Sequence, residues 1–183
     1  MKVTEFSIEG LKLIEPKRFG DDRGFFQEVW NQKNYESAGI IEKFVQDNLS
    51  YSQKGVLRGL HFQNPNFQGK LVYVLEGEVF DVAVDLRQSS PTFGQWHGVY
   101  LSRDNGHQFW VTPGFAHGFA VCSERALFSY KCTELYAPAG EYSLLWNDPE
   151  VGIQWPKGIE WLLSEKDHKA YSLKDLPKEA LFK

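Results

Sequence analysis

Side chains that can hold an anion or move a proton interrupt the apolar segments in the middle of this sequence. They are Arg58 and His61 in "VLRGLHFQ", Lys70 after a glycine, His117 in "GFAHGF" and Tyr130 in "ALFSYKCTE". An imidazole suits a base near neutral pH, a phenol can donate a proton, and a Lys or Arg can stabilise an oxyanion. Each residue alone also has a structural explanation, as a hydrogen-bonded core histidine or a packed tyrosine. Their accumulation predicts a pocket that abstracts a proton next to a carbonyl.

The spacing of Arg58 and His61 raises a geometric question. The two residues are three positions apart, so in a regular strand their side chains would point to opposite faces. Gly59 lies between them, and a glycine inside a strand often marks a bulge or a close backbone approach. We therefore predict a bulge at Gly59 that brings both side chains to one side.

Three other chemistries fit these residues less well. Barrels often bind a metal through an HxH pair, a Glu and a later His, but Gln63 stands at the second position of that pair here. His61 and His117 then supply two ligands, whereas a stable site has three or four. No GxSxG segment marks a nucleophilic serine and no GxGxxG turn marks a dinucleotide site. Proton transfer remains, and we expect no metal site.

The elements that must position these residues are mostly strands. In "KLVYVLEGEVFDVAVDLR" two apolar runs flank Glu76-Gly77-Glu78, which predicts a hairpin, and the second run alternates with period two. Further strands are predicted at "QWHGVYLS", "HQFWVT", "HGFAVCS" and "ALFSYKCTELY", with turns between them. Short helices are predicted at "NQKNYESAGI", ending near Gly39, and in the tail from about Ser164 to Lys183. Short strands at this spacing predict an all-β sandwich or barrel.

Composition limits the possible partners. The 183 residues fit one domain, and 42% are hydrophobic, which is typical of a globular chain. A formal charge of −4 gives no basic field for nucleic acid, and no apolar run is long enough to span a membrane. The N-terminus lacks an apolar signal core, and Cys122 and Cys132 are expected to be reduced. These features favour a cytoplasmic protein.

Long motifs follow one another from about residue 10 to residue 167: "FGDDRGFFQEVW", "FVQDN", "GVLRGLHFQ", "QGKLVYVLEGEVFDVAVDLR", "SPTFGQW", "PGFAHGF", "YKCTELYAP", "WNDPEVGIQWP" and "LSEKD". Together they resemble the dTDP-4-dehydrorhamnose 3,5-epimerase family. The resemblance implies a single domain over residues 1–183, with a cupin-type jelly-roll core at about 20–150, N-terminal strands and a C-terminal helical tail. It also implies a homodimer with a shared site, no metal or organic cofactor, and conversion of dTDP-4-dehydro-6-deoxy-D-glucose to dTDP-4-dehydro-L-rhamnose.

The resemblance further implies roles for individual residues. His61 resembles the catalytic base, Asp167 the carboxylate that orients and polarises it, and Tyr130 the acid on the opposite face of the sugar ring. Lys70 resembles the residue that stabilises the enolate at C4. The substrate-binding set that the resemblance implies is Arg23, Glu28, Gln46, Asp47, Asn48, Arg58, His117, Glu141 and Lys166, and Phe19, Phe26 and Tyr136 are candidates to line the pocket or stack on a ring.

Two departures and three alternatives accompany the resemblance. Leu49 stands where the family often has His, and Tyr73 where it often has Arg, so nucleotide or dimer contacts are open to change. The nearest alternative is a single-centre epimerase that inverts only C3 or only C5. A ketone isomerase is disfavoured by the presence of both His61 and Tyr130. A non-catalytic sugar-nucleotide-binding barrel would need no His–Asp dyad, so Asp167 disfavours it.

Overall fold

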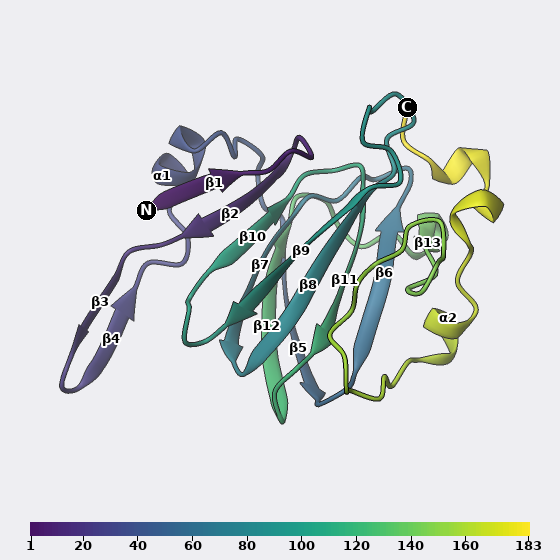
Figure 1. The fold of residues 1–183 in the computed structure, drawn as a ribbon. Helices are drawn as coiled ribbons and strands as arrows, with labels where there is room; N and C mark the ends of the chain where they lie inside the picture. Colours follow the sequence, from purple (N-terminus) through teal and green to yellow (C-terminus); the bar gives the residue numbers. More distant parts are fainter.

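Two antiparallel sheets form the body of the chain, whose residues 1–183 are all described by the computed structural model (Figure 1). The larger sheet runs in the order β1 (Lys2–Glu5), β2 (Leu11–Glu15), β10 (Gln108–Val111), β7 (Lys70–Glu76), β12 (Arg125–Cys132) and β5 (Gln46–Gln53). The smaller sheet runs β13 (Glu141–Ser143), β6 (Leu57–Gln63), β11 (Phe115–Val121), β8 (Glu78–Asp85) and β9 (Trp96–Ser102). The predicted all-β jelly-roll barrel is confirmed.

The main core lies between the two sheets. A cluster of 15 buried residues fills this space, with Val72, Phe109 and Phe128 from the larger sheet facing Ala83 and Phe119 from the smaller one. Successive side chains of a strand point to opposite faces, so each strand gives every second residue to this interior. Polar residues in those inward positions are therefore held inside the barrel.

Strand β8 is buried on both faces. Val79 and Ala83 point into the barrel, while Phe80, Val82 and Val84 belong to a second buried cluster on the outer side of the smaller sheet. That outer cluster also contains residues from the C-terminal part of the chain: Leu144, Val151, Leu176, Ala180 and Phe182. The alternation in β8 thus separates an inward face carrying aspartates from an outward apolar face that packs against the tail.

The predicted hairpin at Glu76-Gly77-Glu78 is wrong. Strand β7 pairs with β10 and β12 in the larger sheet, whereas β8 pairs with β11 and β9 in the smaller one. Gly77 has a φ of +79°, and a Cβ atom there would lie 2.0 Å from the carbonyl oxygen of Arg125. The glycine therefore makes a tight corner at which the chain passes from one sheet to the other.

The helices are short and peripheral, as predicted. Helix α1 (Gln32–Ser37) begins after the N-cap Asn31, and Gly39 follows its end with a φ of +77°. Its Tyr35 packs with Ile40 against the outer side of the larger sheet. The tail holds α2 (Glu165–His168) and 3-10 turns at Leu173–Asp175 and Lys178–Ala180, and a further 3-10 turn spans Pro138–Gly140.

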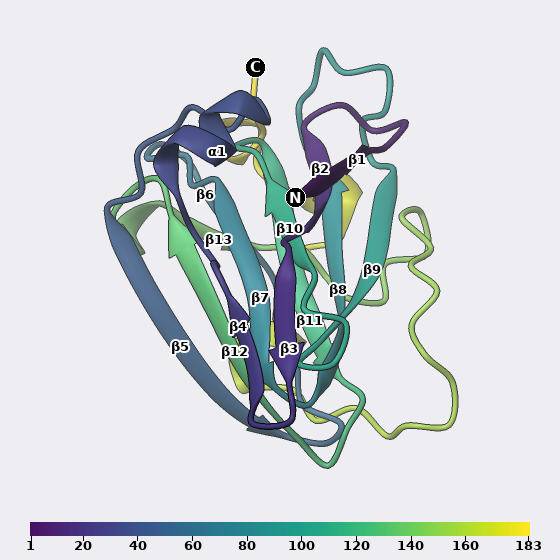
Figure 2. The same ribbon diagram turned by 90° about the vertical axis from the view of Figure 1, so that its left-hand side faces the viewer.

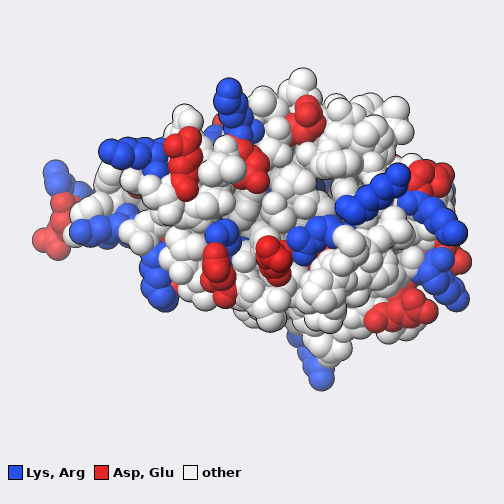
Figure 3. Space-filling model, turned by 90° about the horizontal axis from the view of Figure 1, so that it is seen from above, with Lys and Arg blue, Asp and Glu red and all other residues white.

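A two-stranded hairpin, β3 (Arg18–Asp21) and β4 (Gly24–Gln27), projects from the barrel (Figures 1 and 2). It exposes aromatic side chains, with Phe26 69% exposed and Phe19 54% exposed. The face seen from above carries Lys and Arg side chains interspersed with Asp and Glu, including at the projecting end (Figure 3). None of the helices is long and apolar enough to cross a membrane.

Candidate active site

The predicted irregularity in β6 is present. His61 pairs with His117 and Arg58 pairs with Phe119, so β6 has one more residue than β11 between the two pairs. Gly59 has a φ of +125°, and a Cβ atom on it would lie 2.6 Å from the Cα atom of Gly118. The two backbones touch there, which only glycine permits. Arg58 and His61 consequently line one cavity from the same strand.

Two adjoining cavities open between the sheets near strands β5, β6 and β12. The first has a volume of about 410 Å³ and is lined by Leu49, Ser50, Tyr51, Arg58, His61, Lys70, His117, Gly118, Phe119, Phe128 and Tyr130. The second has a volume of about 300 Å³ and is lined by Gln46, Asn48, His61, Phe62, Gln63, Gln68, Lys70, Tyr130, Cys132, Tyr136 and Glu141. His61, Lys70 and Tyr130 line both cavities, so they stand at the junction.

His61 is bonded to Asp167, a residue 106 positions later in the chain. Its Nε2 lies 2.6 Å from Oδ1 of Asp167, whose side chain is 4% exposed. Ser164, the N-cap of α2, donates its hydroxyl to Oδ2 at 2.8 Å. Burial acts to raise the pKa of Asp167, but the hydrogen bonds from His61 and Ser164 outweigh it and hold that pKa below its usual range. Asp167 is therefore a carboxylate that fixes one ring nitrogen of His61.

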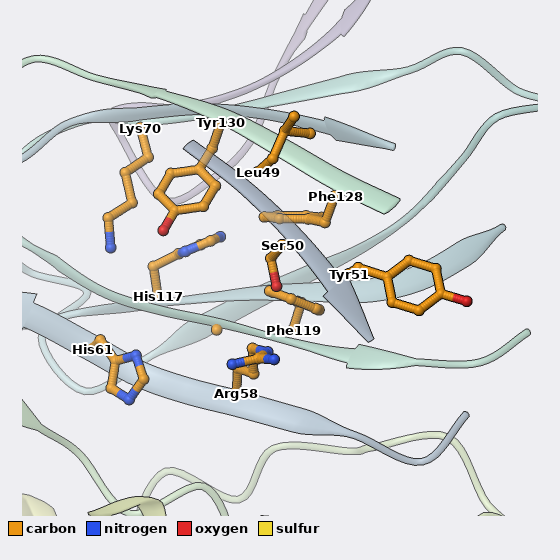
Figure 4. Close-up of a pocket in the computed structure, with 11 residues that line it drawn as sticks. Leu49, Ser50, Tyr51, Arg58, His61, Lys70, His117, Phe119, Phe128 and Tyr130 are labelled. Atoms are coloured by element: carbon orange, nitrogen blue, oxygen red, sulfur yellow. The ribbon is translucent and has the colours of Figure 1, made fainter. Parts of the chain in front are cut away.

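Tyr130 reaches the same cavity from the opposite sheet. Figure 4 shows Tyr130 and Lys70 entering from one side, His61 and Arg58 from the other, and His117 between them. Burial raises the pKa of the Tyr130 phenol, and the Arg58 cation partly opposes this rise. The phenol is therefore protonated at neutral pH and has no hydrogen-bond partner within the chain. It is free to donate to a bound molecule.

Lys70 and His117 complete this group. Burial lowers the pKa of Lys70, and Cys132, Asp81 and Glu141 partly oppose this effect. His117 is buried, and its Nε2 lies 2.9 Å from Oδ1 of Asp81. Arg58 donates from Nε to the hydroxyl of Ser52 at 3.1 Å, which holds the guanidinium at the rim.

The second cavity is bounded by amides and by a charged cluster. Gln46 and Asn48 point inward from β5, and the Gln46 side-chain amide donates to Asn48 at 3.0 Å. The Glu141 carboxylate forms an ion pair with Lys166 and accepts the Tyr136 hydroxyl at 2.8 Å. Burial acts to raise the pKa of Glu141, but Lys166 and Tyr136 together hold it below its usual range. Glu141 is therefore ionised beside an exposed aromatic ring.

Four of the predicted binding residues line neither cavity in the single chain, and one of them, Lys166, is connected to the second cavity only through its ion pair with Glu141. Arg23 lies at the tip of the projecting hairpin, where it pairs with Asp21. Glu28 accepts hydrogen bonds from Asn31 and Asn34 next to α1. Asp47 points outward from β5, and Lys131 Nζ lies 2.7 and 2.9 Å from its two carboxylate oxygens.

The chain matches a known family of proteins over nearly its whole length. A family model described as dTDP-4-dehydrorhamnose 3,5-epimerase matches residues 5–175. The chain belongs to this family. Among its curated members, the dTDP-4-dehydrorhamnose 3,5-epimerase of Pseudomonas aeruginosa is 55% identical over 176 residues, which cover 96% of this chain and 97% of the relative.

Solved structures of the epimerase family give the same result. An epimerase from Legionella pneumophila, in complex with dTDP-4-keto-L-rhamnose, is 55% identical with a TM-score of 0.96, covering 99% of this chain and 97% of that one. A 3'-monoepimerase from Streptomyces bikiniensis, in complex with dTDP-quinovose, is 35% identical with a TM-score of 0.87, covering 93% of this chain and 87% of the other. Epimerases that act on different numbers of centres thus share this fold.

Some residues of the site were not found from the sequence. Asp81 bonds His117, and Ser164 bonds Asp167, yet neither breaks an apolar segment in a way that marks it. The only signal for Asp81 was its place in the alternation of β8, beside Val79 and Ala83. Gln63, considered above as a replaced metal ligand, binds the carbonyls of Asn66 and Leu135 and so joins two loops. No group of three or more His, Cys, Asp or Glu side chains is placed to hold a metal ion.

Proposed function

We propose that the chain is a dTDP-4-dehydrorhamnose 3,5-epimerase that converts dTDP-4-dehydro-6-deoxy-D-glucose to dTDP-4-dehydro-L-rhamnose, a step of dTDP-L-rhamnose biosynthesis. Membership of the family and 55% identity to a curated epimerase support this activity. The observation that carries the proposal is the placement of His61 and Tyr130 on facing strands at one cavity junction, with Lys70 beside them.

The chemistry follows from the ketone at C4 of the substrate. The carbonyl acidifies the protons on C3 and C5, so a base can remove one and leave an enolate whose charge lies on the C4 oxygen. His61 takes the proton on one face of the ring, supported by Asp167. Tyr130 gives a proton to the same carbon from the other face, and the centre inverts. The phenolate and the imidazolium return to their starting forms by exchange with water, and the cycle repeats at the second carbon.

Lys70 stabilises the enolate, and His117 binds the groups next to it. A cation near the C4 oxygen stabilises charge that develops only in the transition state, in a site that excludes much of the water. Arg58 and His117 contact the sugar and the diphosphate. Gln46, Asn48 and Glu141 bind the nucleotide part from the second cavity, with Lys166 paired to Glu141 beside it, and the Tyr136 ring is available for stacking on a base.

The chain acts as a homodimer in this proposal. The projecting hairpin exposes Phe19 and Phe26 and carries Arg23 outside the cavities of its own chain. Leu49 and Tyr51 on the edge strand β5 are also exposed. Aromatic and apolar groups of this kind are typical of interfaces. A hairpin that reaches a second copy brings Arg23 to the site of that copy, which accounts for its distance from its own cavities.

The activity is tested by proton NMR of the substrate incubated with the protein in heavy water. A 3,5-epimerase incorporates deuterium at both C3 and C5 and yields the doubly inverted sugar. Deuterium at a single carbon, with inversion there alone, would instead identify a single-centre epimerase. The absence of exchange at both carbons in folded protein would contradict the proposed function.

Dimerisation is tested separately by sedimentation. Phe26→Ser removes an exposed ring without touching either cavity, so we expect the variant to shift towards the monomer and to bind the nucleotide sugar more weakly. Tyr171→Ser, which removes another exposed ring in the C-terminal tail, serves as the control and keeps the wild-type mass. A wild-type protein that sediments as a monomer at assay concentration would exclude a shared site.

A further inference from the structure

The segment that carries Asp167 runs along the smaller sheet as a strap, defined here as residues 162–173. Its α-helical part is the four residues of α2, which lies beside strand β6 (Figure 1). From this helix Asp167 reaches His61 at 2.6 Å, although the two residues are 106 positions apart in the chain. A helix of one turn is not stable by itself. The position of Asp167 therefore depends on the contacts that hold the strap.

The strap begins at an anchor on the turn before β6. The Leu162 N–H donates to the carbonyl of Gly55 at 2.8 Å, and the Leu57 N–H donates to the carbonyl of Leu162 at 3.0 Å. Gly55 has a φ of +84°, and a Cβ atom on it would lie 2.5 Å from the carbonyl oxygen of Glu160. The close approach of the two backbones at this anchor therefore requires glycine.

The strap ends at a second anchor, beside β13. The Tyr171 N–H donates to the carbonyl of Ser143 at 3.0 Å, and the Leu145 N–H donates to the carbonyl of Tyr171 at 2.7 Å. Two residues further on, the Leu173 N–H donates to Oδ2 of Asp148 at 2.8 Å. The chain is therefore tied down on both sides of α2.

Asp148 is a buried carboxylate that accepts hydrogen bonds from backbone groups of two segments. It is 2% exposed, and its Oδ1 accepts the N–H of Glu150 at 2.8 Å and that of Val151 at 3.1 Å. Its Oδ2 is the oxygen that accepts from Leu173. One oxygen thus fixes the turn that follows Asp148 and the other fixes the strap. Asp148 lines neither cavity.

Both anchors are attached to segments that also fix His61. Gly55 lies in the turn that leads into β6, the strand of His61, and Ser143 of β13 is paired directly with His61. We propose that Gly55 and Asp148 are positioning residues that fix the two ends of the strap and so hold Asp167 against His61. The proposal rests on the proposed function, because His61 is the base of that reaction. A misplacement of about 1 Å in an active site can cost on the order of 10²-fold in rate.

The first measurement needs no turnover. Nitrogen NMR of the labelled His61 ring in the free protein reports which ring nitrogen carries the proton, with His61→Asn used for assignment. The ionised Asp167 accepts from Nε2, so we expect the wild-type ring to be protonated there. Asp148→Asn replaces an accepting oxygen with an amide N–H, and Gly55→Ala displaces the Glu160 carbonyl. In both variants we expect the Nε2–H form to lose population to the Nδ1–H form.

Kinetics supply the second measurement. Both variants are expected to lower kcat with little change in KM, because Gly55 and Asp148 line neither cavity. The fall is at most that of Asp167→Asn, about 10- to 150-fold, since both residues act through that carboxylate. For the same reason, adding either change to Asp167→Asn lowers kcat no further. A merely structural role would lower kcat by the same factor in both backgrounds.

Two control variants make matched changes outside the strap. Gly158→Ala introduces similar backbone strain at a φ of +79°, but a Cβ atom there meets nothing within 4 Å. Asp85→Asn removes another buried carboxylate, whose side-chain partners lie in residues 87–92. We expect both controls to lose stability while they keep the wild-type His61 spectrum and the wild-type kcat per folded molecule.

Two results would overturn the proposal. One is a folded Asp148→Asn protein with the wild-type His61 spectrum and kcat, and this variant decides alone if Gly55→Ala does not fold. The other is a further fall in kcat when Asp148→Asn is added to Asp167→Asn. Because the spectrum is recorded without substrate, its result is distinct from a failure of the epimerase activity, which would show as missing deuterium exchange in the wild-type protein.

Discussion

The bond between His61 and Asp167 gives a prediction whose size follows from the geometry. Asp167→Asn removes the charge from a hydrogen bond of 2.6 Å while keeping the side-chain shape. Hydrogen bonds to charged groups contribute about 1.5–3 kcal/mol, and about 1.4 kcal/mol is tenfold in rate, so kcat is expected to fall about 10- to 150-fold. KM stays close to the wild-type value, because Asp167 does not line either cavity.

The assay is steady-state turnover together with deuterium exchange, and two further variants make it decisive. Ser164→Ala removes the hydroxyl that donates to Asp167 Oδ2 and the N-cap of α2, but it leaves the carboxylate in place. It is expected to cost about 1 kcal/mol of stability and to lower kcat less than Asp167→Asn does. This control separates a loosened helix from a lost charge.

The double variant tests whether Asp167 acts through His61. His61→Asn removes the base, and general-base catalysis is worth roughly 10²–10⁴-fold, so its kcat falls at least that far. If Asp167 acts only through His61, the double variant is no slower than His61→Asn alone. A double variant slower by the full factor of Asp167→Asn would refute the reasoning, since the carboxylate would then act on something else.

Four further outcomes are expected. Activity survives exhaustive chelation, and its loss with rescue by one divalent ion would contradict proton transfer by side chains alone. In Tyr130→Phe, deuterium still enters at C3 or C5 while net inversion collapses, and inversion of both centres at the wild-type rate would place the acid elsewhere. Gly59→Ala places a Cβ atom 2.6 Å from Gly118 Cα at a φ of +125°, so urea denaturation should show a loss of at least about 1–3 kcal/mol together with reduced kcat. Asp85→Asn destabilises the fold by roughly 3–5 kcal/mol at neutral pH. Hydrogen bonds from Arg87, Ser90 and Thr92 outweigh burial and lower the pKa of Asp85. The stability that the carboxylate contributes is therefore lost when it is protonated, and the difference from the wild type shrinks below about pH 4.

Alternation along the sequence predicted where the strands lie but not which strands pair. The runs around Gly77 were correctly assigned as strands, yet their pairing was wrong, because a corner between sheets and a hairpin leave similar apolar patterns. The bulge at Gly59 was predictable, since the positions of Arg58 and His61 required it. Asp167 was accessible only through resemblance, because contacts over 106 residues leave no trace in local spacing.

The direction of individual side chains was harder to predict than the strands that carry them. In "QDN", Gln46 and Asn48 point into the cavity while Asp47 points outward to Lys131, as alternation in one strand requires. Asp81 was concealed for a related reason. An aspartate in a period-two pattern suggests the solvent side of a strand, but β8 is covered on both faces, so its polar row is the interior one.

Because both faces of β8 are covered, its two rows of side chains contact different parts of the protein. A substitution of Asp81 in the inward row affects His117 of the first cavity, whereas substitutions in the outward row, such as Val82 and Val84, affect packing against the C-terminal tail. A library designed to change substrate choice therefore belongs on the inward row and its facing strands. One designed to raise the melting temperature belongs on the outward row and the tail residues Leu176 and Phe182, and the two sets of changes can be combined with little interference.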